Sequence, residues 1–259
     1  MADLTVIFGA TGGLGSAVVD AFAKRGDRVI AVARSRSGVS ELAAKYPLSP
    51  SPSGGGQVTS PSPFGGGPGG GVSGDTADLT SRQDVDDLWE RIDRVGVPRW
   101  VVNTTGGYRG GKVVDSTPDD FTAMMDLNLG TTWWSCRAAA RRMQRTEPSP
   151  SGGGQSGGIV NVSSRSALVA EPGAAAYAIA KAGVIKLTAV LAAELKSSGV
   201  RVNVVVPAVI DTAENRKSLP EKLMQKAVAP AEIAAVIVYL CSDAAAAITG
   251  AVVPVYGNF

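Results

Sequence analysis

A glycine-rich segment near the N-terminus constrains the fold more than any other part of the sequence. The run Gly9-Ala-Thr-Gly-Gly-Leu-Gly15 follows an apolar stretch, Leu4–Phe8, that predicts a buried strand, and it precedes an expected helix over 16–25. A strand, a glycine turn and a helix in this order are typical of a dinucleotide-binding unit. In such a unit the glycines let the backbone approach a pyrophosphate, and the helix N-terminus attracts its charge.

The rest of the chain continues the alternation of apolar runs and helical stretches. Further strands are expected at 28–33, 72–77, 99–103, 158–163, 200–206 and 251–255, and helices at 38–46, 82–95, 118–143, 174–195 and 230–241. We predict a loop with one short helix over 208–226. This pattern predicts an α/β fold, a single-domain doubly wound parallel sheet (Rossmann-like) with helices on both faces, spanning residues 1–259.

Two low-complexity segments interrupt the alternation, at about 48–71 and 146–157. The octapeptide Pro50–Gln57 recurs identically at Pro148–Gln155, and such Ser-, Pro- and Gly-rich sequence cannot bury a core. We therefore predict two mobile loop insertions. Both follow a helix and precede a strand, so they are expected at the N-terminal edge of the sheet, away from the C-terminal edge where ligands bind.

The composition excludes several classes of function. The chain of 259 residues has no histidine, which removes Ser-His-Asp chemistry and histidine metal ligands, and its net charge of +2 does not favour nucleic acid or anionic membranes. Two cysteines make neither a Cys-rich zinc site nor a secreted disulfide framework, and no metal is expected. No apolar run approaches the ~18 residues that span a membrane, and no signal segment precedes Leu4, so we expect a cytoplasmic protein.

Residues 161–181 hold the side chains that are suited to proton transfer. Tyr177 and Lys181 lie one turn apart in a stretch rich in Ala and Leu, so both side chains leave one face of the expected helix. A tyrosine hydroxyl titrates near about 10, and a neighbouring ammonium is expected to lower that pKa. Ser164 ends an apolar run, where its hydroxyl can hold a carbonyl oxygen beside the tyrosine. Taken singly, each residue also fits a purely structural role: Tyr177 as a buried tyrosine, Lys181 as a solvated lysine on the helix surface, and Ser164 as a serine at a strand end.

In their order and spacing these motifs resemble the classical short-chain dehydrogenase/reductase family over essentially the full chain. The thirteen-residue step from Ser164 to Tyr177 and the four-residue step to Lys181 are specific marks of the resemblance. The resemblance implies an NAD(P)-dependent oxidoreductase that moves a hydride between a nicotinamide cofactor and a carbonyl or hydroxyl substrate. A ketone, an aldehyde, a quinone or a 3-oxoacyl compound would be such a substrate. The resemblance also implies a homodimer or homotetramer that pairs through long apolar helices.

The resemblance further implies roles for individual residues. Tyr177 would be the catalytic acid/base, Ser164 the clamp on the substrate oxygen, and Lys181 the residue that holds the nicotinamide ribose. Asn128 would carry a water of the proton relay, Asp78 would contact the adenine amine, and the carboxamide end of the nicotinamide would meet the loop after Pro207. The residues implied for cofactor binding are Gly9, Thr11, Gly13, Leu14, Gly15, Arg34, Asp78, Leu79, Asn103, Gly106, Tyr177, Lys181, Pro207, Ile210 and Thr212.

The end of the strand over 28–33 favours NADPH over NADH. A carboxylate there would bind both ribose hydroxyls and repel a 2′-phosphate, but the sequence has Ala33 followed by Arg34. A guanidinium can bind a phosphate through two charge-assisted hydrogen bonds. No carboxylate occurs between Asp27 and Glu41. The alternative is that Arg34 is solvated and that the pocket has no preference between NADPH and NADH.

Two other functions stay open on the sequence alone. A non-catalytic dinucleotide-binding regulator would keep the fold without turnover. The spacing of Gly9, Gly12 and Gly15 also suits the extended branch with epimerases and dehydratases, although the ~100 further residues of a separate substrate domain are absent. The sequence departs from the family pattern at Thr104–Thr105, where Asn-Ala is usual, and at Ala208, where Gly is usual.

The substrate cannot be read from the sequence, but candidate specificity residues can be named. They are Tyr108, Arg109, Trp133, Trp134 and the segment 213–226. Trp133 and Trp134 fit packing in the core or between subunits better than a substrate wall. Arg216 and Lys217 fit a solvated position better than anion binding.

Overall fold

Strand β1 (Leu4–Phe8) pairs with a strand on either side, β2 (Arg28–Ala33) and β4 (Trp100–Asn103), so the chain begins in the middle of a sheet. The computed structural model describes residues 2–48, 70–144 and 157–258. Within them the other strands are β3 (Gly71–Thr76), β5 (Gly158–Val162), β6 (Arg201–Pro207) and β7 (Val252–Val255). These described strands form a parallel seven-stranded sheet in the order β3-β2-β1-β4-β5-β6-β7, which confirms the predicted fold class.

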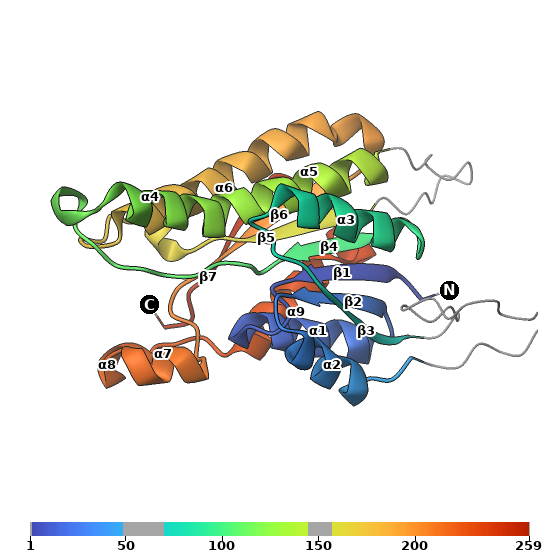
Figure 1. Cartoon of the computed structure of the whole chain (residues 1–259), viewed down its shortest axis with the longest axis horizontal. Coiled ribbons are helices and arrows are strands. Elements are labelled where there is room, and N and C mark those ends of the chain that lie inside the picture. The colour runs from blue at the N-terminus through green and yellow to red at the C-terminus, as the bar shows by residue number, and fades with distance from the viewer. Residues whose placement is uncertain (1, 49–69, 145–156, 259) are drawn as a thin grey trace, which may run out of the picture.

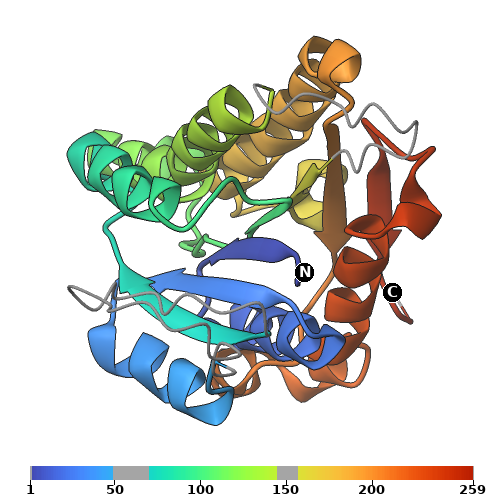
Figure 2. The ribbon, with the colours of Figure 1, turned by 90° about the vertical axis from the view of Figure 1, so that its right-hand side faces the viewer.

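Two layers of helices cover the sheet (Figure 1). One face carries α1 (Gly13–Arg25), α2 (Arg36–Lys45) and α9 (Pro230–Leu240), and the other carries α3 (Arg82–Asp93), α5 (Thr131–Met143) and α6 (Ala175–Glu194). Figure 2 shows the twisted sheet between the two layers. The core is divided in the same way, because alternate strand residues point to opposite faces. Val6 and Phe8 pack with the α3 and α5 layer, and Ile7 packs with α1 and α9.

Helix α1 follows β1 directly and ends at Gly26, which takes a left-handed φ of 93° that suits glycine. It begins at Gly13, three residues before the expected start, because the glycine loop itself forms the first turn. Short segments complete the structure at the C-terminal ends of the strands. They are α4 (Pro118–Met124), α7 (Ala213–Ser218), α8 (Glu221–Met224) and 3-10 turns at Val113–Asp115 and Arg165–Ala167; two further 3-10 turns are Lys196–Ser198 and Asp243–Ala245.

The prediction of a single helix over 118–143 is wrong. The segment divides into α4, a π-helical turn at Met125–Gly130, and α5. Side chains compete with the backbone at this point: Asn128 Nδ2 donates to the Met124 carbonyl at 3.1 Å, and Thr132 Oγ1 donates to the Asn128 carbonyl at 2.9 Å. Such competition widens a helical turn, and π-helical turns are frequent at functional sites.

The two predicted insertions lie outside the described residues, so their mobility stays a prediction. Their described ends do lie at the N-terminal edge of the sheet. Leu48 sits beside Gly71 at the start of β3, where an added Cβ on Gly71 would lie 2.6 Å from the Leu48 Cα. Gly157 sits beside Arg99 just before β4, where an added Cβ on Gly157 would lie 2.3 Å from the Arg99 carbonyl oxygen.

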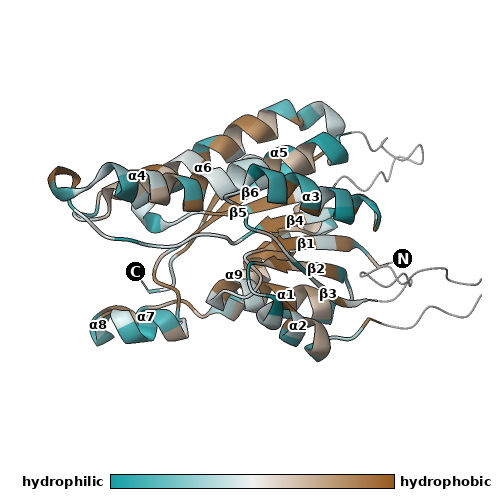
Figure 3. Ribbon diagram, viewed as in Figure 1, coloured by the Kyte–Doolittle hydropathy of each residue, from teal (hydrophilic) through white to brown (hydrophobic). Residues whose placement is uncertain are grey.

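Helix α6 is long and apolar enough to cross a membrane by length and composition, so the expectation that no segment approaches that threshold is wrong. Core helices of folded domains pass the same test. Here α6 packs on β6 and buries Val184 and Leu191. Figure 3 shows the hydrophobic strands beneath this helix layer and the more hydrophilic α7 and α8 at the edge of the molecule.

Candidate active site

The glycine loop after β1 makes close backbone contact with the loop after β4. Gly9 has a φ of 77°, and a Cβ added there would lie 2.8 Å from the Thr105 backbone nitrogen. Gly15 packs directly against the same turn, because a Cβ added to Gly15 would collide with the Gly9 carbonyl oxygen at 2.0 Å. Among the described residues, no side chain caps the α1 N-terminus at Gly12. Its backbone N–H groups are therefore available to an anion such as a pyrophosphate.

A cavity of about 230 Å³ lies along this loop and the C-terminal ends of β1, β2, β3 and β4. Six of the predicted cofactor residues line it: Gly9, Thr11, Arg34, Asp78, Leu79 and Gly106. The sequence predictions missed other lining residues that come from the same strand ends and from the π-helical region: Thr80, Thr104, Thr105, Leu127 and Thr131. Thr104 and Thr105 had a signal in the sequence, because they depart from the family pattern.

The other predicted cofactor residues lie around this cavity rather than on its wall. Leu14 and Asn103 are buried, and Pro207 ends β6. Gly13 packs against Thr212, whose Cγ2 would lie 2.5 Å from an added Cβ. Ile210 belongs to the same loop after β6, so this loop meets the glycine loop although the two are distant in sequence.

Charges at the ends of β2 and β3 face the cavity. The Asp78 carboxylate accepts hydrogen bonds from Thr80 Oγ1 at 2.7 Å and Thr80 N at 2.9 Å, and these bonds, aided by Arg34, lower the pKa of Asp78. Arg34 is exposed, and Ser35 caps α2 by accepting a hydrogen bond from Gly38 N at 3.3 Å. The end of β2 thus presents a guanidinium next to a helix N-terminus, a combination that attracts anions.

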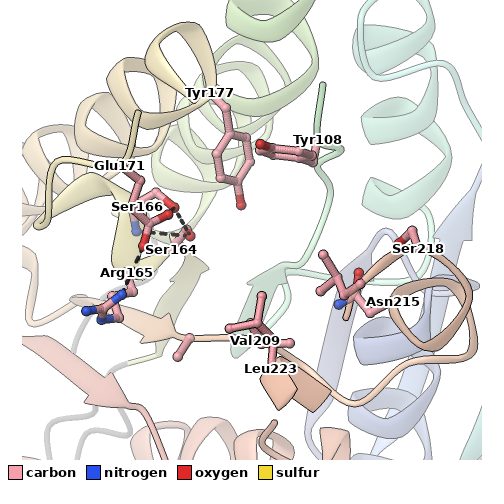
Figure 4. A pocket seen from close by; sticks show the side chains of 12 residues that line it. Tyr108, Ser164, Arg165, Ser166, Glu171, Tyr177, Val209, Asn215, Ser218 and Leu223 are labelled. Carbon is pink, nitrogen blue, oxygen red and sulfur yellow. Dashed lines mark hydrogen bonds and ion pairs between the residues drawn. The ribbon is translucent and has the colours of Figure 1, made fainter. Parts of the chain in front are cut away.

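Hydrogen bonds between the end of β5 and helix α6 hold Lys181 next to the segment that carries Ser164. Ser163 Oγ donates to the Lys181 carbonyl at 2.7 Å, and Lys181 Nζ donates to the Val162 carbonyl at 3.1 Å. Figure 4 shows the Tyr177 hydroxyl pointing into a pocket whose wall includes Ser164. The structure therefore brings the predicted proton-transfer side chains to one place.

The ionisation of Tyr177 differs from the prediction. Burial raises the pKa of Tyr177, and the Ser164 hydroxyl only partly opposes this effect. The prediction that Lys181 lowers this pKa is wrong for the structure, because the ammonium points to Val162 and its Nζ lies 5.9 Å from the centre of the tyrosine ring. Burial lowers the pKa of Lys181 to about 8. At neutral pH Tyr177 therefore keeps its proton and can donate it. The pKa of Lys181, about 8, lies just above neutral pH.

Asn128 is fully buried and fixes the loop after β4. Its Nδ2 donates to the Gly107 carbonyl at 3.0 Å, and Gly107 N donates to its Oδ1 at 3.2 Å. An added Cβ on Gly106 would lie 2.8 Å from Asn128 Oδ1 and 3.0 Å from Lys181 Nζ. Asn128, Gly106 and Lys181 therefore form one cluster at the wall of the cofactor cavity, which Gly106 lines.

The second cavity, of about 530 Å³, contains the Tyr177 hydroxyl. Tyr108 packs edge-on against Tyr177, with ring centres 5.2 Å apart at 82°. One wall is polar and comes from the segment between β5 and α6, with Ser164, Arg165, Ser166 and Glu171. The opposite wall is mainly apolar and comes from the loop after β6 and from α7 and α8, with Ala208, Val209, Asn215, Ser218, Leu219 and Leu223.

Some of the candidate specificity residues line this pocket, and others lie elsewhere in the structure. Tyr108 and part of the segment 213–226 line it. Arg109 forms an ion pair with Asp120 at 2.8 Å, and Trp133 lies on the outer surface of α5. The sequence predictions missed Arg165, Ser166 and Glu171. Their signal was their place between Ser164 and Tyr177, on a segment that must pass the reacting atoms.

The fold, the glycine loop and the tyrosine-lysine pair together define a class, the dinucleotide-dependent oxidoreductases with a single Rossmann-like sheet. Comparison with known proteins agrees. The sequence model of the family described as enoyl-(acyl carrier protein) reductase matches residues 70–257. The chain is 32% identical to D-threitol dehydrogenase of Mycolicibacterium smegmatis, over 99% of this chain and 92% of that protein.

Two further relatives cover nearly the same length. The chain is 29% identical to a 3-oxoacyl-(acyl-carrier-protein) reductase of Thermotoga maritima, over 98% of this chain and 96% of that protein. It is 27% identical to meso-2,3-butanediol dehydrogenase of Serratia marcescens, over 98% of this chain and 93% of that protein. The chain belongs to the short-chain dehydrogenase/reductase family. It is therefore an NAD(P)-dependent oxidoreductase acting on CH–OH or C=O groups, and not a regulator.

Proposed function

We propose that the chain is an NADPH-preferring carbonyl reductase that also works in reverse as an alcohol dehydrogenase, with Tyr177 as its acid/base. A ketone, aldehyde, quinone or 3-oxoacyl compound is the substrate class. The observation that carries this proposal is the Tyr177 hydroxyl, which points into a cavity beside Ser164 while Lys181 lies buried one helical turn away. Names of relatives also support it, since they include both alcohol dehydrogenases and 3-oxoacyl reductases.

The residues present fit a nicotinamide dinucleotide. Gly9 and Gly106 line the cofactor cavity at close contacts that leave no room for a Cβ, and the uncapped N-terminus of α1 suits a pyrophosphate. Gly9, Thr11 and Gly13 would hold the phosphates, Asp78 and Leu79 the adenine, and Lys181 with the loop 207–212 the nicotinamide end. When bound, this cofactor supplies or accepts the hydride.

Three side chains of the chain account for the proton chemistry of the reduction. Ser164 donates a hydrogen bond to the carbonyl oxygen of the substrate and so orients it. Tyr177 carries its proton at neutral pH, because burial raises its pKa, and it gives that proton to the same oxygen. Lys181 acts beside these groups: its buried ammonium, with a pKa of about 8, would hold the nicotinamide ribose. Asn128 fixes the backbone at Gly107, and we assign to it the place of a proton-relay water.

The preference for NADPH rests on Arg34. Its guanidinium lines the cofactor cavity at the end of β2, and Arg36 and Ser37 follow on the first turn of α2. Neither the end of β2 nor that first turn carries a carboxylate that would repel a 2′-phosphate. A guanidinium beside a helix N-terminus binds phosphate through both hydrogen bonds and charge.

We further propose that the protein is a homodimer or homotetramer in the cytoplasm. Helices α5 and α6 expose Trp133 and Val190, by 47% and 44%, beside a hollow of about 660 Å³. An exposed apolar surface of this kind is typical of a protein interface. Light scattering at micromolar concentration is expected to give a multiple of the chain mass, and a monomer mass would contradict this proposal.

A cofactor-oxidation screen tests the proposed function. Diacetyl, a quinone and an acetoacetyl thioester are offered with saturating NADPH or NADH, and loss of reduced cofactor is recorded. We expect turnover of at least one carbonyl, faster with NADPH. Turnover of none with either cofactor would refute the proposal.

A further inference from the structure

A chain of polar contacts leads from Ser164 away from the reacting atoms. Ser164 Oγ donates to Ser166 Oγ at 3.4 Å, and Ser166 Oγ donates to Glu171 Oε2 at 2.8 Å. Arg165 Nη1 donates to the other carboxylate oxygen, Glu171 Oε1, at 2.9 Å. Figure 4 shows these side chains together on the polar wall of the substrate pocket.

Each of the two serines has one hydroxyl proton, and this determines the direction of the hydrogen bonds from Ser164 to Glu171. A carboxylate paired with a guanidinium only accepts hydrogen bonds, so Ser166 uses its one proton on Glu171. Ser166 Oγ can then act toward Ser164 only as an acceptor. Ser166 N also donates to Ser164 Oγ, at 3.3 Å. The Ser164 hydroxyl is therefore held from two sides, by one donor and one acceptor that belong to the same residue.

The lengths of these contacts allow Ser164 to change partners. A hydroxyl–hydroxyl bond of 3.4 Å is longer than the usual ~2.7–2.8 Å and correspondingly weak. A carbonyl oxygen that arrives in the pocket at ordinary distance is a better acceptor for the Ser164 proton. The Ser166 N–H stays on the Ser164 oxygen throughout, which limits the rotation of the hydroxyl and polarises its O–H bond.

We propose that Ser166 and Glu171 are positioning residues, which hold the Ser164 hydroxyl ready to donate to the substrate oxygen. The inference rests on the proposed function, in which Ser164 binds the carbonyl oxygen. Glu171 fixes the orientation of the Ser166 hydroxyl, Ser166 fixes that of Ser164, and Arg165 anchors the carboxylate. Neither positioning residue needs to touch the substrate for this effect.

Stability of the fold does not explain the arrangement. The side chains of Arg165 and Glu171 are 32% and 40% exposed, and ion pairs that face solvent contribute little to folding. Ser166 lies in a short 3-10 turn at the surface of the pocket and belongs to none of the three core clusters of the described residues. Removing these groups is therefore expected to change catalysis more than the melting temperature.

A double-mutant cycle in kcat/KM tests the proposal. Ser166→Ala and Ser164→Ala are made singly and together, and each protein reduces diacetyl, or the acetoacetyl thioester if that is turned over faster, with saturating NADPH. We expect Ser166→Ala to lower kcat/KM about 3- to 10-fold in the parent chain, as for the loss of one hydrogen bond. In the Ser164→Ala background the same change is expected to have no effect, because the group it positions is gone.

The carboxylate is tested with a matched pair of variants. Glu171→Gln keeps an oxygen that accepts the Ser166 proton, so it is expected to retain more activity than Glu171→Ala. The Kd for NADPH, read by fluorescence titration, is expected to stay within about twofold for all of these variants, since none lines the cofactor cavity.

Three results would overturn the inference. They are full activity of Ser166→Ala, an equal loss from Ser166→Ala in both backgrounds, and equal activity of Glu171→Gln and Glu171→Ala. In each case the parent chain still reduces the probe, so the proposed function stands. Absence of any turnover by the parent chain would instead reject the proposed function and this inference together.

Discussion

The two cavities at the C-terminal edge of the sheet are built in different ways. The cofactor cavity is lined by the glycine loop, by the ends of four neighbouring strands and by the π-helical region. The substrate cavity is formed by side chains of α6, of the segment before it, and of α7 and α8. The turn at the glycine loop requires particular glycines, whereas side chains that line a pocket can be changed by single substitutions. The first two predictions below each act on one cavity and are expected to leave the other intact.

The largest effect is expected for Tyr177→Phe. This change removes the proton donor and keeps the ring that packs against Tyr108, so kcat is expected to fall about 10²- to 10⁴-fold. The Kd for NADPH, measured by fluorescence titration, should remain close to that of the parent. A variant that keeps more than about a tenth of the parent kcat would remove Tyr177 from the acid/base role.

The next effect concerns the cofactor cavity alone. The double variant Ala33→Asp/Arg34→Ala introduces a ribose-binding carboxylate and removes the guanidinium. The ratio of kcat/KM with NADPH to that with NADH is expected to fall about tenfold to hundredfold. Lys24→Ala serves as the control, because it removes an exposed cation of α1 that pairs with Asp20 outside both cavities. Equal use of the two cofactors by the parent chain would contradict the assignment of Arg34.

The contrast between the cavities also explains which parts of the site could be predicted from sequence. The turn at Gly9 and the one-turn spacing of Tyr177 and Lys181 are local features, and the structure places both as expected. The direction of the Lys181 ammonium depends on its rotamer and on the Val162 carbonyl, so the predicted lowering of the Tyr177 pKa does not occur and burial raises that pKa instead.

The remaining differences have the same origin in tertiary contacts. At the π-helical turn, Asn128 combines a local hydrogen bond to Met124 with hydrogen bonds to Gly107 on another loop, and local propensity does not contain the latter. Glu171 reaches Ser166 through a turn whose shape is set by packing between β5 and α6. The cofactor-cavity residues missed from sequence, such as Leu127 and Thr131, likewise come from an element that crosses over the strand ends.

A pH profile of reduction sharpens the role of Lys181. Burial lowers its pKa to about 8, so the ammonium is present below that value and is lost as the pH rises through it. Tyr177 has a raised pKa and keeps its proton over the same range. The kcat for reduction is therefore expected to be level near neutral pH and to fall about tenfold per unit above pH 8. A rate that stays constant up to about pH 10 would show that the charge of Lys181 is not required.

The smallest effect is expected for shortening the first low-complexity segment. Replacing residues 50–70 with a short Gly-Ser link joins Ser49 to Gly71, and Leu48 already lies against Gly71 at the N-terminal edge of the sheet. Because both cavities lie at the opposite edge, kcat/KM is expected to stay within about threefold. A large loss of activity with an unchanged circular dichroism spectrum would place this segment at the site.

The central claim is that the chain transfers a hydride from NADPH to a carbonyl carbon. The direct measurement uses NADPH that carries deuterium at the transferable position, with diacetyl, a quinone and an acetoacetyl thioester as acceptors, and mass spectrometry of the products. For each cofactor oxidised with diacetyl or the thioester, the account predicts one deuterium on the new carbinol carbon of the alcohol product, and formation of that product at least about 10²-fold slower with Tyr177→Phe. Cofactor oxidation without deuterium in any product, or no oxidation at all, would contradict it.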